Sequence, residues 1–213
     1  MADSQRTAGK DASQGQSKNA RHAARMERKK ALIDAAIAAA TDERGLLLVI
    51  TGNGKGKSTS AFGMVARALG HGMKVGVVQF IKSRTDTGEE AFLGRQPDVE
   101  WHVTGDGFTW DTQNRAQDIA TAECGWAIAA RMLADPAFNL VVLDELTYLL
   151  SYGYLDSDTV LDALANRPPM QHVVVTGRAA SDALIELADT VSVIADEKHA
   201  FRAGVKAQPG IDL

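Results

Sequence analysis

The sequence predicts an α/β fold in which a mostly parallel β-sheet is covered by helices on both faces. Short runs rich in Val, Ile and Leu recur along the chain, and segments with helical character lie between them. A glycine-rich turn joins the first of these runs to the first such helix. Near-continuous apolar strands that alternate with helices are typical of a parallel sheet buried on both faces. We therefore expect a three-layer domain.

The first forty residues are expected to lie outside this domain. Residues 1–20 are mainly small or polar, so they cannot bury enough surface to offset their chain entropy, and we predict a disordered tail. Residues 21–40 are rich in strong helix formers and predict a helix in which Met26, Ile33 and Ile37 share roughly one face. No apolar run follows the early positive charges, which argues against a signal peptide.

The domain itself is expected over residues 45–213, a length that suits a single core. Its helices are predicted at Thr59–Leu69, Ala116–Leu133 and Ser157–Ala165. The long, irregular interval from Ser83 to Trp110 is a candidate functional loop region around a weaker strand. The strands are predicted at Leu46–Ile50, Val75–Ile81, Val99–Val103 (the weaker one), Leu140–Leu143, His172–Thr176 and Val191–Ile194.

The composition excludes several classes of protein. No stretch approaches the roughly 18 apolar residues of a membrane-spanning helix, so we expect no membrane association. The single cysteine, Cys124, excludes an internal disulfide and a multi-cysteine metal site, and it is most simply a packing residue. A reducing, cytoplasmic location is the natural expectation.

A glycine-rich segment that runs from Thr51 to Thr59 predicts a phosphate-binding loop. It follows a strand and opens a helix, so successive backbone N–H groups and the helix N-terminus can surround a polyphosphate. Lys57 would neutralise phosphate oxygens, and the Ser58 hydroxyl would ligate Mg²⁺. The strict motif G-x-x-x-x-G-K-[ST] is not met, and an ordinary glycine-rich turn is the alternative. The candidate nucleotide-binding residues are Thr51, Gly52, Asn53, Gly54, Lys55, Gly56, Lys57, Ser58 and Thr59.

Two acidic residues, Asp144 and Glu145, follow the apolar run that begins at Leu140. A carboxylate at the end of a buried strand is the usual neighbour of phosphate-bound Mg²⁺ in nucleotide-binding sheets. Such a pair can also be an ordinary loop start, but together with the phosphate loop it favours a metal role for one of the two acids, directly or through water. These features predict a P-loop NTPase (RecA-like) fold and leave hydrolase, kinase, motor and group transferase open.

Six segments, which include the phosphate loop and the strand end with Asp144 and Glu145, closely resemble in this order the ATP:corrinoid adenosyltransferases. The resemblance extends from about Arg21 to the C-terminus, and its third and sixth segments are far more particular than a phosphate loop. The segments are Thr51-Gly-Asn-Gly-Lys-Gly-Lys-Ser, Gly76-Val-Val-Gln-Phe-Ile-Lys82, Gly107-Phe-Thr-Trp-Asp-Thr-Gln-Asn114, Val142-Leu-Asp-Glu-Leu-Thr-Tyr148, Val175-Thr-Gly-Arg178 and Lys198-His-Ala-Phe-Arg-Ala-Gly-Val-Lys-Ala-Gln208.

The resemblance implies a specific reaction. Co(I) of a reduced corrinoid, either cobalamin or a precursor, attacks C5′ of ATP and releases triphosphate, with Mg²⁺ or Mn²⁺ as the cofactor. It further implies that ATP is held in the reversed sense relative to P-loop hydrolases, that a reductase or flavodoxin-type donor supplies the electron, and that the protein is a homodimer. The cobalt carries the difficult step, so no protein nucleophile is required.

The resemblance also assigns residues. Phe108 and Trp110 would form an apolar wedge beneath the corrin ring and, with Lys57, would be the catalytic residues. Core packing is the alternative for the aromatic pair, although Thr109 between them is polar. Arg67, Arg178 and His199 would contact ATP, and the helix over residues 21–40 would act as a lid.

Two other functions remain as alternatives. A P-loop NTPase or kinase of the same fold would act at the γ-phosphate of ATP. A nucleic-acid-associated ATPase would use the basic first forty residues, which carry a net charge of +4, as an arm. The rest of the chain carries −8, so we expect no nucleic-acid partner.

Overall fold

The computed structural model describes residues 4–81, 87–105 and 114–212, with only the backbone for residues 4–18. The chain forms two compact units, one ending at Glu43 and the other beginning at Arg44. None of the described helices is long and apolar enough to cross a membrane.

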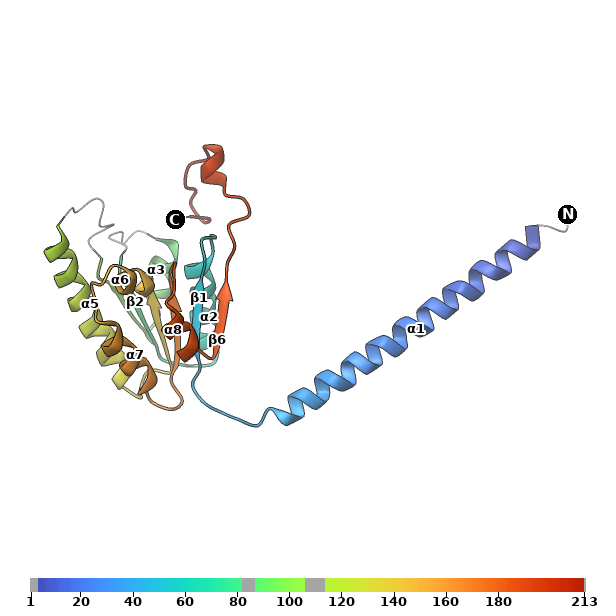
Figure 1. The fold of residues 1–213 in the computed structure, drawn as a ribbon, viewed down its shortest axis with the longest axis horizontal. Coiled ribbons are helices and arrows are strands. Elements are labelled where there is room, and N and C mark those ends of the chain that lie inside the picture. Colours follow the sequence, from blue (N-terminus) through green and yellow to red (C-terminus); the bar gives the residue numbers. More distant parts are fainter. Residues whose placement is uncertain (1–3, 82–86, 106–113, 213) are drawn as a thin grey trace. The chain divides into compact units, whose positions relative to one another are not determined.

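The first unit contains one long helix, α1 (Ser4–Ala39) (Figure 1). The predicted helix over residues 21–40 is present, but it starts much earlier than expected and includes most of the segment predicted to be disordered. That prediction depended on the lack of apolar side chains to bury. A helix satisfies its backbone hydrogen bonds locally, so Ala, Gln, Lys and Arg can extend it without a core.

The second unit is built on a six-stranded sheet with the order β3-β2-β4-β5-β1-β6, in which all five pairs of neighbours are parallel. The predicted parallel α/β fold is therefore confirmed, and each predicted strand is present to within two residues at either end. The strands are β1 (Leu47–Thr51), β2 (Val75–Gln79), β3 (Val99–Val103), β4 (Leu140–Asp144), β5 (His172–Thr176) and β6 (Thr190–Val193).

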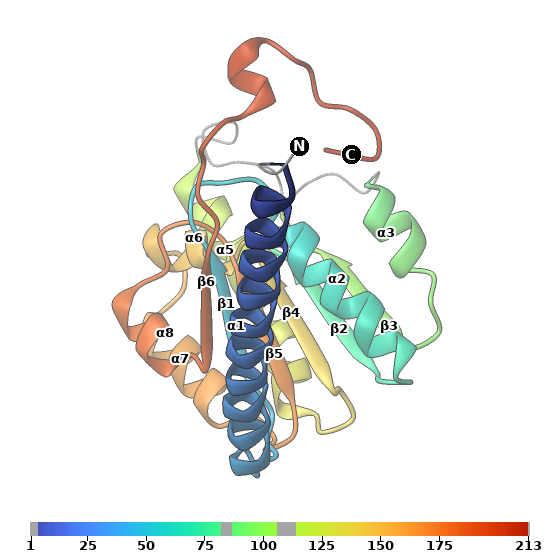
Figure 2. The same ribbon diagram turned by 90° about the vertical axis from the view of Figure 1, so that its right-hand side faces the viewer.

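Helices cover both faces of this sheet (Figure 2). On one face, α2 (Lys57–Gly70) and α3 (Gly88–Leu93) pack against apolar side chains that include Ile50 and Val142. The other face, which includes Val49 and Val141, is covered by α5 (Arg115–Ala134), α6 (Leu146–Ser151), α7 (Ser157–Ala165) and α8 (Asp182–Leu187). A short 3₁₀ helix, η1 (Ala200–Ala203), lies near the C-terminus.

The carboxyl ends of all six strands meet at one edge of the sheet, because every pairing is parallel. Four of these strands end in a polar residue that is buried there: Thr51, Gln79, Asp144 and Thr176. Ligands of open parallel sheets bind at this edge. The functional site is therefore expected beside these four residues.

Asp189, just before β6, ties the beginning of β1 to its neighbours. Its carboxylate accepts hydrogen bonds from the Leu47 N–H (2.8 Å) and from the Arg44 guanidinium (2.5 Å). The hydrogen bond from Arg44 holds the pKa of Asp189 below its ordinary value, although burial opposes it. Because the folded state favours the ionised carboxylate, Asp189 stabilises the fold at pH values above the ordinary pKa of an aspartate. This contribution is lost as the pH falls through the lower pKa that Asp189 has in the folded state.

We therefore expect Asp189→Asn to lower the free energy of unfolding at pH 7 by about 1–2 kcal/mol. The gap between the wild type and the variant should narrow as the pH falls below about 4, where the unfolded chain becomes protonated, and should close below the lowered pKa of the folded state. Urea unfolding between pH 3 and pH 7 measures both quantities. A gap that stays constant over this range would show that the charge of Asp189 does not contribute.

Candidate functional site

The phosphate loop between β1 and α2 is built on glycines that the backbone requires. Gly52 has a φ of 99° and Gly56 a φ of 117°, a region that side chains disfavour. A Cβ at Gly52 would lie 2.4 Å from the Ile194 carbonyl oxygen, and one at Gly54 would lie 2.3 Å from that of Ala195. The Gly54 N–H also donates to the Ile194 carbonyl (2.8 Å). The chain after β6 therefore packs directly on the loop.

A cavity of about 260 Å³ lies over this loop. Most of the predicted nucleotide-binding residues line it, and sequence reasoning missed Glu89 and the C-terminal pair Ile211 and Asp212. Its lining residues are Asn53, Gly54, Lys55, Gly56, Lys57, Ser58, Thr59, Glu89, Glu145, Arg178, His199, Ile211 and Asp212. We call it the phosphate cavity.

Lys57, the first residue of α2, is a buried cation in this cavity. Only 7% of the residue is exposed, and its Nζ donates a hydrogen bond to the Gly54 carbonyl (2.8 Å). Burial lowers the pKa of Lys57, with Arg178 acting in the same direction, whereas Glu145 and Asp144 raise it. A charge that is largely removed from solvent is weakly screened, so it can interact strongly with an anion in the cavity.

The two acids at the carboxyl end of β4, Asp144 and Glu145, have different environments. Asp144 is fully buried, and its carboxylate accepts hydrogen bonds from the Gln79 amide (2.9 Å) and the Thr176 hydroxyl (2.7 Å). Glu145 adopts a left-handed conformation (φ 66°), and it is the acid that lines the phosphate cavity. Its N–H donates to the Thr176 hydroxyl oxygen (2.9 Å).

Sequence analysis did not identify Gln79 or Thr176 as part of the site. Each is a polar residue at the end of an apolar strand, a signal that the sequence does contain. Their proximity to Asp144 depends on the strand order β2-β4-β5, which strand patterns alone do not give.

Arg178 and His199 reach the cavity from two other segments. The Arg178 carbonyl accepts a hydrogen bond from the Thr147 hydroxyl (2.6 Å), which joins the segment after β5 to α6. A Cβ at Gly177 would lie only 2.0 Å from that hydroxyl oxygen, so this close packing requires glycine. His199 caps η1 by accepting a hydrogen bond from the Phe201 N–H (3.2 Å).

Arg67 does not line the phosphate cavity. It lies near the end of α2 and, with His71 and His172, lines a separate cavity of about 230 Å³. His172 is the first residue of β5, so this cavity lies toward the amino ends of the strands, away from the phosphate loop. Phe108 and Trp110, the predicted corrin wedge, lie outside the described residues.

The C-terminal segment places a carboxylate at the phosphate loop. Asp212 forms an ion pair with Lys55 (Nζ to Oδ1, 2.7 Å), and its Oδ2 accepts a hydrogen bond from the Gln208 N–H (3.0 Å). The hydrogen bond from Lys55 is the main reason that the pKa of Asp212 is lowered. The carboxylate thus occupies the side of Lys55 where an anionic ligand could bind.

We expect Asp212→Asn to tighten ATP binding by about two- to fivefold at low salt, the range of an exposed ion pair. The substitution removes a negative charge from the cavity and leaves Lys55 available to phosphate. The effect should shrink at high salt, because exposed charges are screened. Calorimetric titration measures the affinity, with Asp196→Asn as the control, since Asp196 pairs with Arg202 on the same segment. An unchanged affinity at low salt would contradict competition by Asp212.

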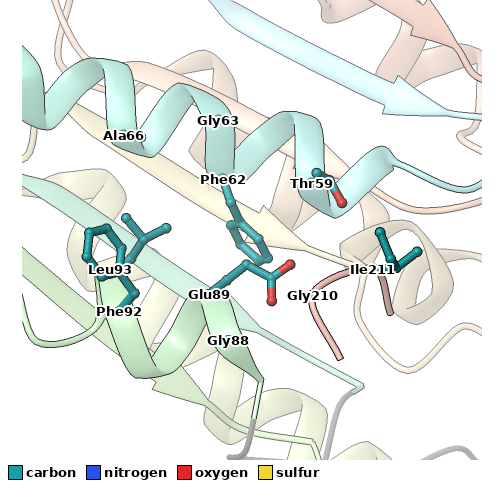
Figure 3. A pocket seen from close by; sticks show the side chains of 10 residues that line it. All are labelled: Thr59, Phe62, Gly63, Ala66, Gly88, Glu89, Phe92, Leu93, Gly210 and Ile211. Carbon is teal, nitrogen blue, oxygen red and sulfur yellow. The ribbon is translucent and has the colours of Figure 1, made fainter. Parts of the chain in front are cut away.

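A larger apolar pocket of about 480 Å³ adjoins the phosphate cavity (Figure 3). Phe62 from α2 and Phe92 and Leu93 from α3 form its apolar wall. The pocket and the cavity share Thr59, Glu89 and Ile211. An apolar pocket beside a cavity lined by charged residues suits a ligand with one apolar and one highly charged part, such as a nucleotide.

The comparisons with known proteins agree on one family. Residues 43–213 match the family described as ATP:corrinoid adenosyltransferase BtuR/CobO/CobP, and residues 11–37 match the family described as Cob(I)alamin adenosyltransferase N terminal. The chain is 63% identical to a corrinoid adenosyltransferase of Pseudomonas aeruginosa, over 92% of this chain and 97% of the relative. It is 53% identical to one from Escherichia coli K12 and 52% identical to corrinoid adenosyltransferase CobA of Salmonella typhimurium, each over 90% of this chain and 97% of the relative.

These matches cover most of the long N-terminal helix and the whole sheet domain with its phosphate cavity. Identity above one half over nearly the full length of two relatives is far more than a shared phosphate loop would produce. The chain therefore belongs to the ATP:corrinoid adenosyltransferase family.

Proposed function

We propose that this protein transfers the 5′-deoxyadenosyl group of ATP to Co(I) of a reduced corrinoid and releases triphosphate. The observation that carries the proposal is the phosphate cavity, with its loop amides and three cations, in a chain that matches the adenosyltransferase family from residue 43 onward. The three cations are Lys55, Lys57 and Arg178.

The residues of the cavity suit the departure of triphosphate. Displacement at a primary carbon needs an in-line approach and a leaving group whose charge is stabilised. Lys57 supplies a desolvated charge, and Lys55 and Arg178 add two more from different segments. The loop residues after Gly54 would supply backbone N–H groups, since the Gly54 N–H itself donates to the Ile194 carbonyl. Because the corrinoid substrate supplies the nucleophile, the site requires no general base.

The donor groups of the cavity also fit Mg²⁺, for which Mn²⁺ can substitute. Ser58 and Glu145 line the cavity, and Asp144 is buried next to Glu145. Among the described residues, no cluster of three or more His, Cys, Asp or Glu side chains could hold a metal alone. Mg²⁺ commonly uses one or two protein oxygens and completes its shell with water and phosphate. When bound, the ion would neutralise charge on the triphosphate.

The corrinoid side of the reaction is proposed from the family resemblance. Phe108 and Trp110 are proposed to lie beneath the corrin ring, where an apolar wedge would exclude water and the lower axial ligand. A reductase or flavodoxin-type donor is proposed to supply Co(I), and the protein is proposed to act as a homodimer. The helix over residues 21–40 is proposed as a lid, and the match of residues 11–37 to the family's N-terminal segment supports a functional role for it.

The reaction products test the proposed function. The protein is incubated without oxygen with ATP, Mg²⁺ and chemically reduced cobalamin, and the phosphate products are separated. Adenosylcobalamin and triphosphate should appear in equal amounts. Orthophosphate and ADP with an unchanged corrin spectrum would instead show a reaction at the γ-phosphate and would exclude adenosyl transfer.

A further inference from the structure

Three polar residues form one row across the carboxyl ends of neighbouring strands. Gln79 ends β2, Asp144 ends β4 and Thr176 ends β5, and the register places Gln79 directly opposite Asp144. All three are almost fully buried, with at most 1% of each residue exposed. Buried polar side chains are costly unless their hydrogen bonds are made, so a complete row of them in an apolar sheet calls for an explanation.

The row holds the Asp144 carboxylate at both of its oxygens. The Gln79 Nε2 donates to Oδ2 (2.9 Å), and the Thr176 Oγ1 donates to Oδ1 (2.7 Å). Two donors on different oxygens fix the plane of the carboxylate as well as its position. The Thr176 hydroxyl oxygen also accepts the Glu145 N–H (2.9 Å), so the same row anchors the backbone of the acid that lines the phosphate cavity.

Trp101 of β3 determines how the Gln79 amide is oriented. The Trp101 indole Nε1 lies 3.1 Å from Gln79 Oε1, and an indole N–H can only donate. The amide oxygen must therefore face Trp101, which turns the amide nitrogen toward Asp144. Packing against Phe62 of α2 holds the indole ring in place, with ring centroids 5.1 Å apart.

We propose that Gln79, oriented by Trp101, is a positioning residue that presets the Asp144 carboxylate for the cation that accompanies the triphosphate of ATP. The inference rests on the proposed function, since it assigns a role within the same site. Residues that orient metal ligands typically change metal affinity about 10- to 100-fold when they are replaced. None of Gln79, Trp101 and Asp144 lines the phosphate cavity, so Gln79 and Trp101 do not touch the nucleotide. They act through the buried Asp144, which adjoins the cavity-lining Glu145 and would act on the cation through water.

Gln79→Met tests the proposal, because methionine has a similar size but no amide. Without corrinoid there is no adenosyl acceptor, so Mn²⁺ binding can be measured by electron paramagnetic resonance on the protein with ATP. We expect the Mn²⁺ dissociation constant to rise about 10- to 100-fold. ATP binding in excess EDTA, measured by calorimetry, should be unchanged. Trp101→Phe, which keeps an aromatic ring but removes the indole donor, should weaken Mn²⁺ binding in the same direction and provides a milder variant.

Gln171→Met is the matched control. Gln171 is as buried as Gln79, but its amide nitrogen donates to three backbone carbonyls, those of Met132, Asp135 and Phe138. This variant should lose thermal stability without a change in Mn²⁺ affinity. Wild-type Mn²⁺ affinity in both Gln79→Met and Trp101→Phe would overturn the inference, as would an equal loss of ATP binding in EDTA. A wild-type protein whose ATP binding shows no dependence on metal would instead contradict the metal site of the proposed function.

Discussion

Replacing Lys57 with alanine is expected to lower kcat/KM for adenosyl transfer by about two to three orders of magnitude. This is the loss seen when one preorganised group that stabilises developing charge is removed. Lys57 is buried at the start of α2, and its ammonium group donates to the Gly54 carbonyl in the phosphate cavity, where a triphosphate would bind. Steady-state kinetics with reduced cobalamin measure the effect.

Lys55→Ala is the matched control for this variant. Lys55 lies in the same loop, but 43% of its side chain is exposed, and it is already paired with Asp212. Its removal should cost much less, because water screens an exposed charge. Equal losses in the two variants would show that the buried position of Lys57 gives it no special role.

The stability of a second variant, Lys57→Met, distinguishes a functional role of Lys57 from a structural one. Burial lowers the pKa of Lys57, so the folded state disfavours its charged form relative to the unfolded chain. This destabilisation is fully present below the folded-state pKa, and it fades as the pH rises from that value to the higher pKa of the unfolded chain. At pH 7, Lys57→Met should therefore unfold at the same urea concentration as the wild type or at a higher one. A large loss of stability would mean that Lys57 supports the fold.

The main elements of the fold could be predicted because buried parallel strands are recognisable in one sequence. β4 and β5 are apolar runs with no alternation, since helices cover both of their faces. The phosphate loop was predictable for a similar reason, since its glycines, its lysine and its strand and helix neighbours are contiguous. The short helices α3, α6 and α8 were not predicted. Each has six residues, fewer than two turns, so no helical periodicity can develop.

The parts of the site that escaped prediction depend on contacts between distant segments. Lys55 and Asp212 meet only because the C-terminal segment returns to the phosphate loop. Gln79 meets Asp144 only because β2 lies beside β4. A propensity or motif describes a local stretch, whereas these contacts depend on the order in which the strands assemble. The start of α1 was predicted at residue 21 but lies at Ser4, and this error has a local cause. Backbone hydrogen bonds within a helix need no distant segment, so the helix can extend into a stretch without apolar side chains.

Gly52→Ala is expected to lower the free energy of unfolding by about 3 kcal/mol or more and to abolish ATP binding. Two independent costs combine at this position. A φ of 99° strains any residue with a Cβ, and that Cβ would lie 2.4 Å from the Ile194 carbonyl oxygen. The Ile194 carbonyl belongs to the backbone, so it cannot move aside as a flexible side chain could. The phosphate loop must therefore shift, and its amides would no longer surround the triphosphate. Urea unfolding and calorimetric titration with ATP measure the two effects.

Gly63→Ala provides the contrast, because the same methyl group is added within α2, where a Cβ would meet nothing within 4 Å. Alanine is a better helix former than glycine, so this variant should gain about 0.5–1 kcal/mol of stability. If Gly→Ala lowers the free energy of unfolding at position 52 but raises it at position 63, the cost at Gly52 comes from its backbone conformation and its contact with the segment after β6. If Gly52→Ala kept the wild-type stability and ATP affinity, that segment could not be packed on the phosphate loop as described, and the loop would have to bind ATP in another conformation.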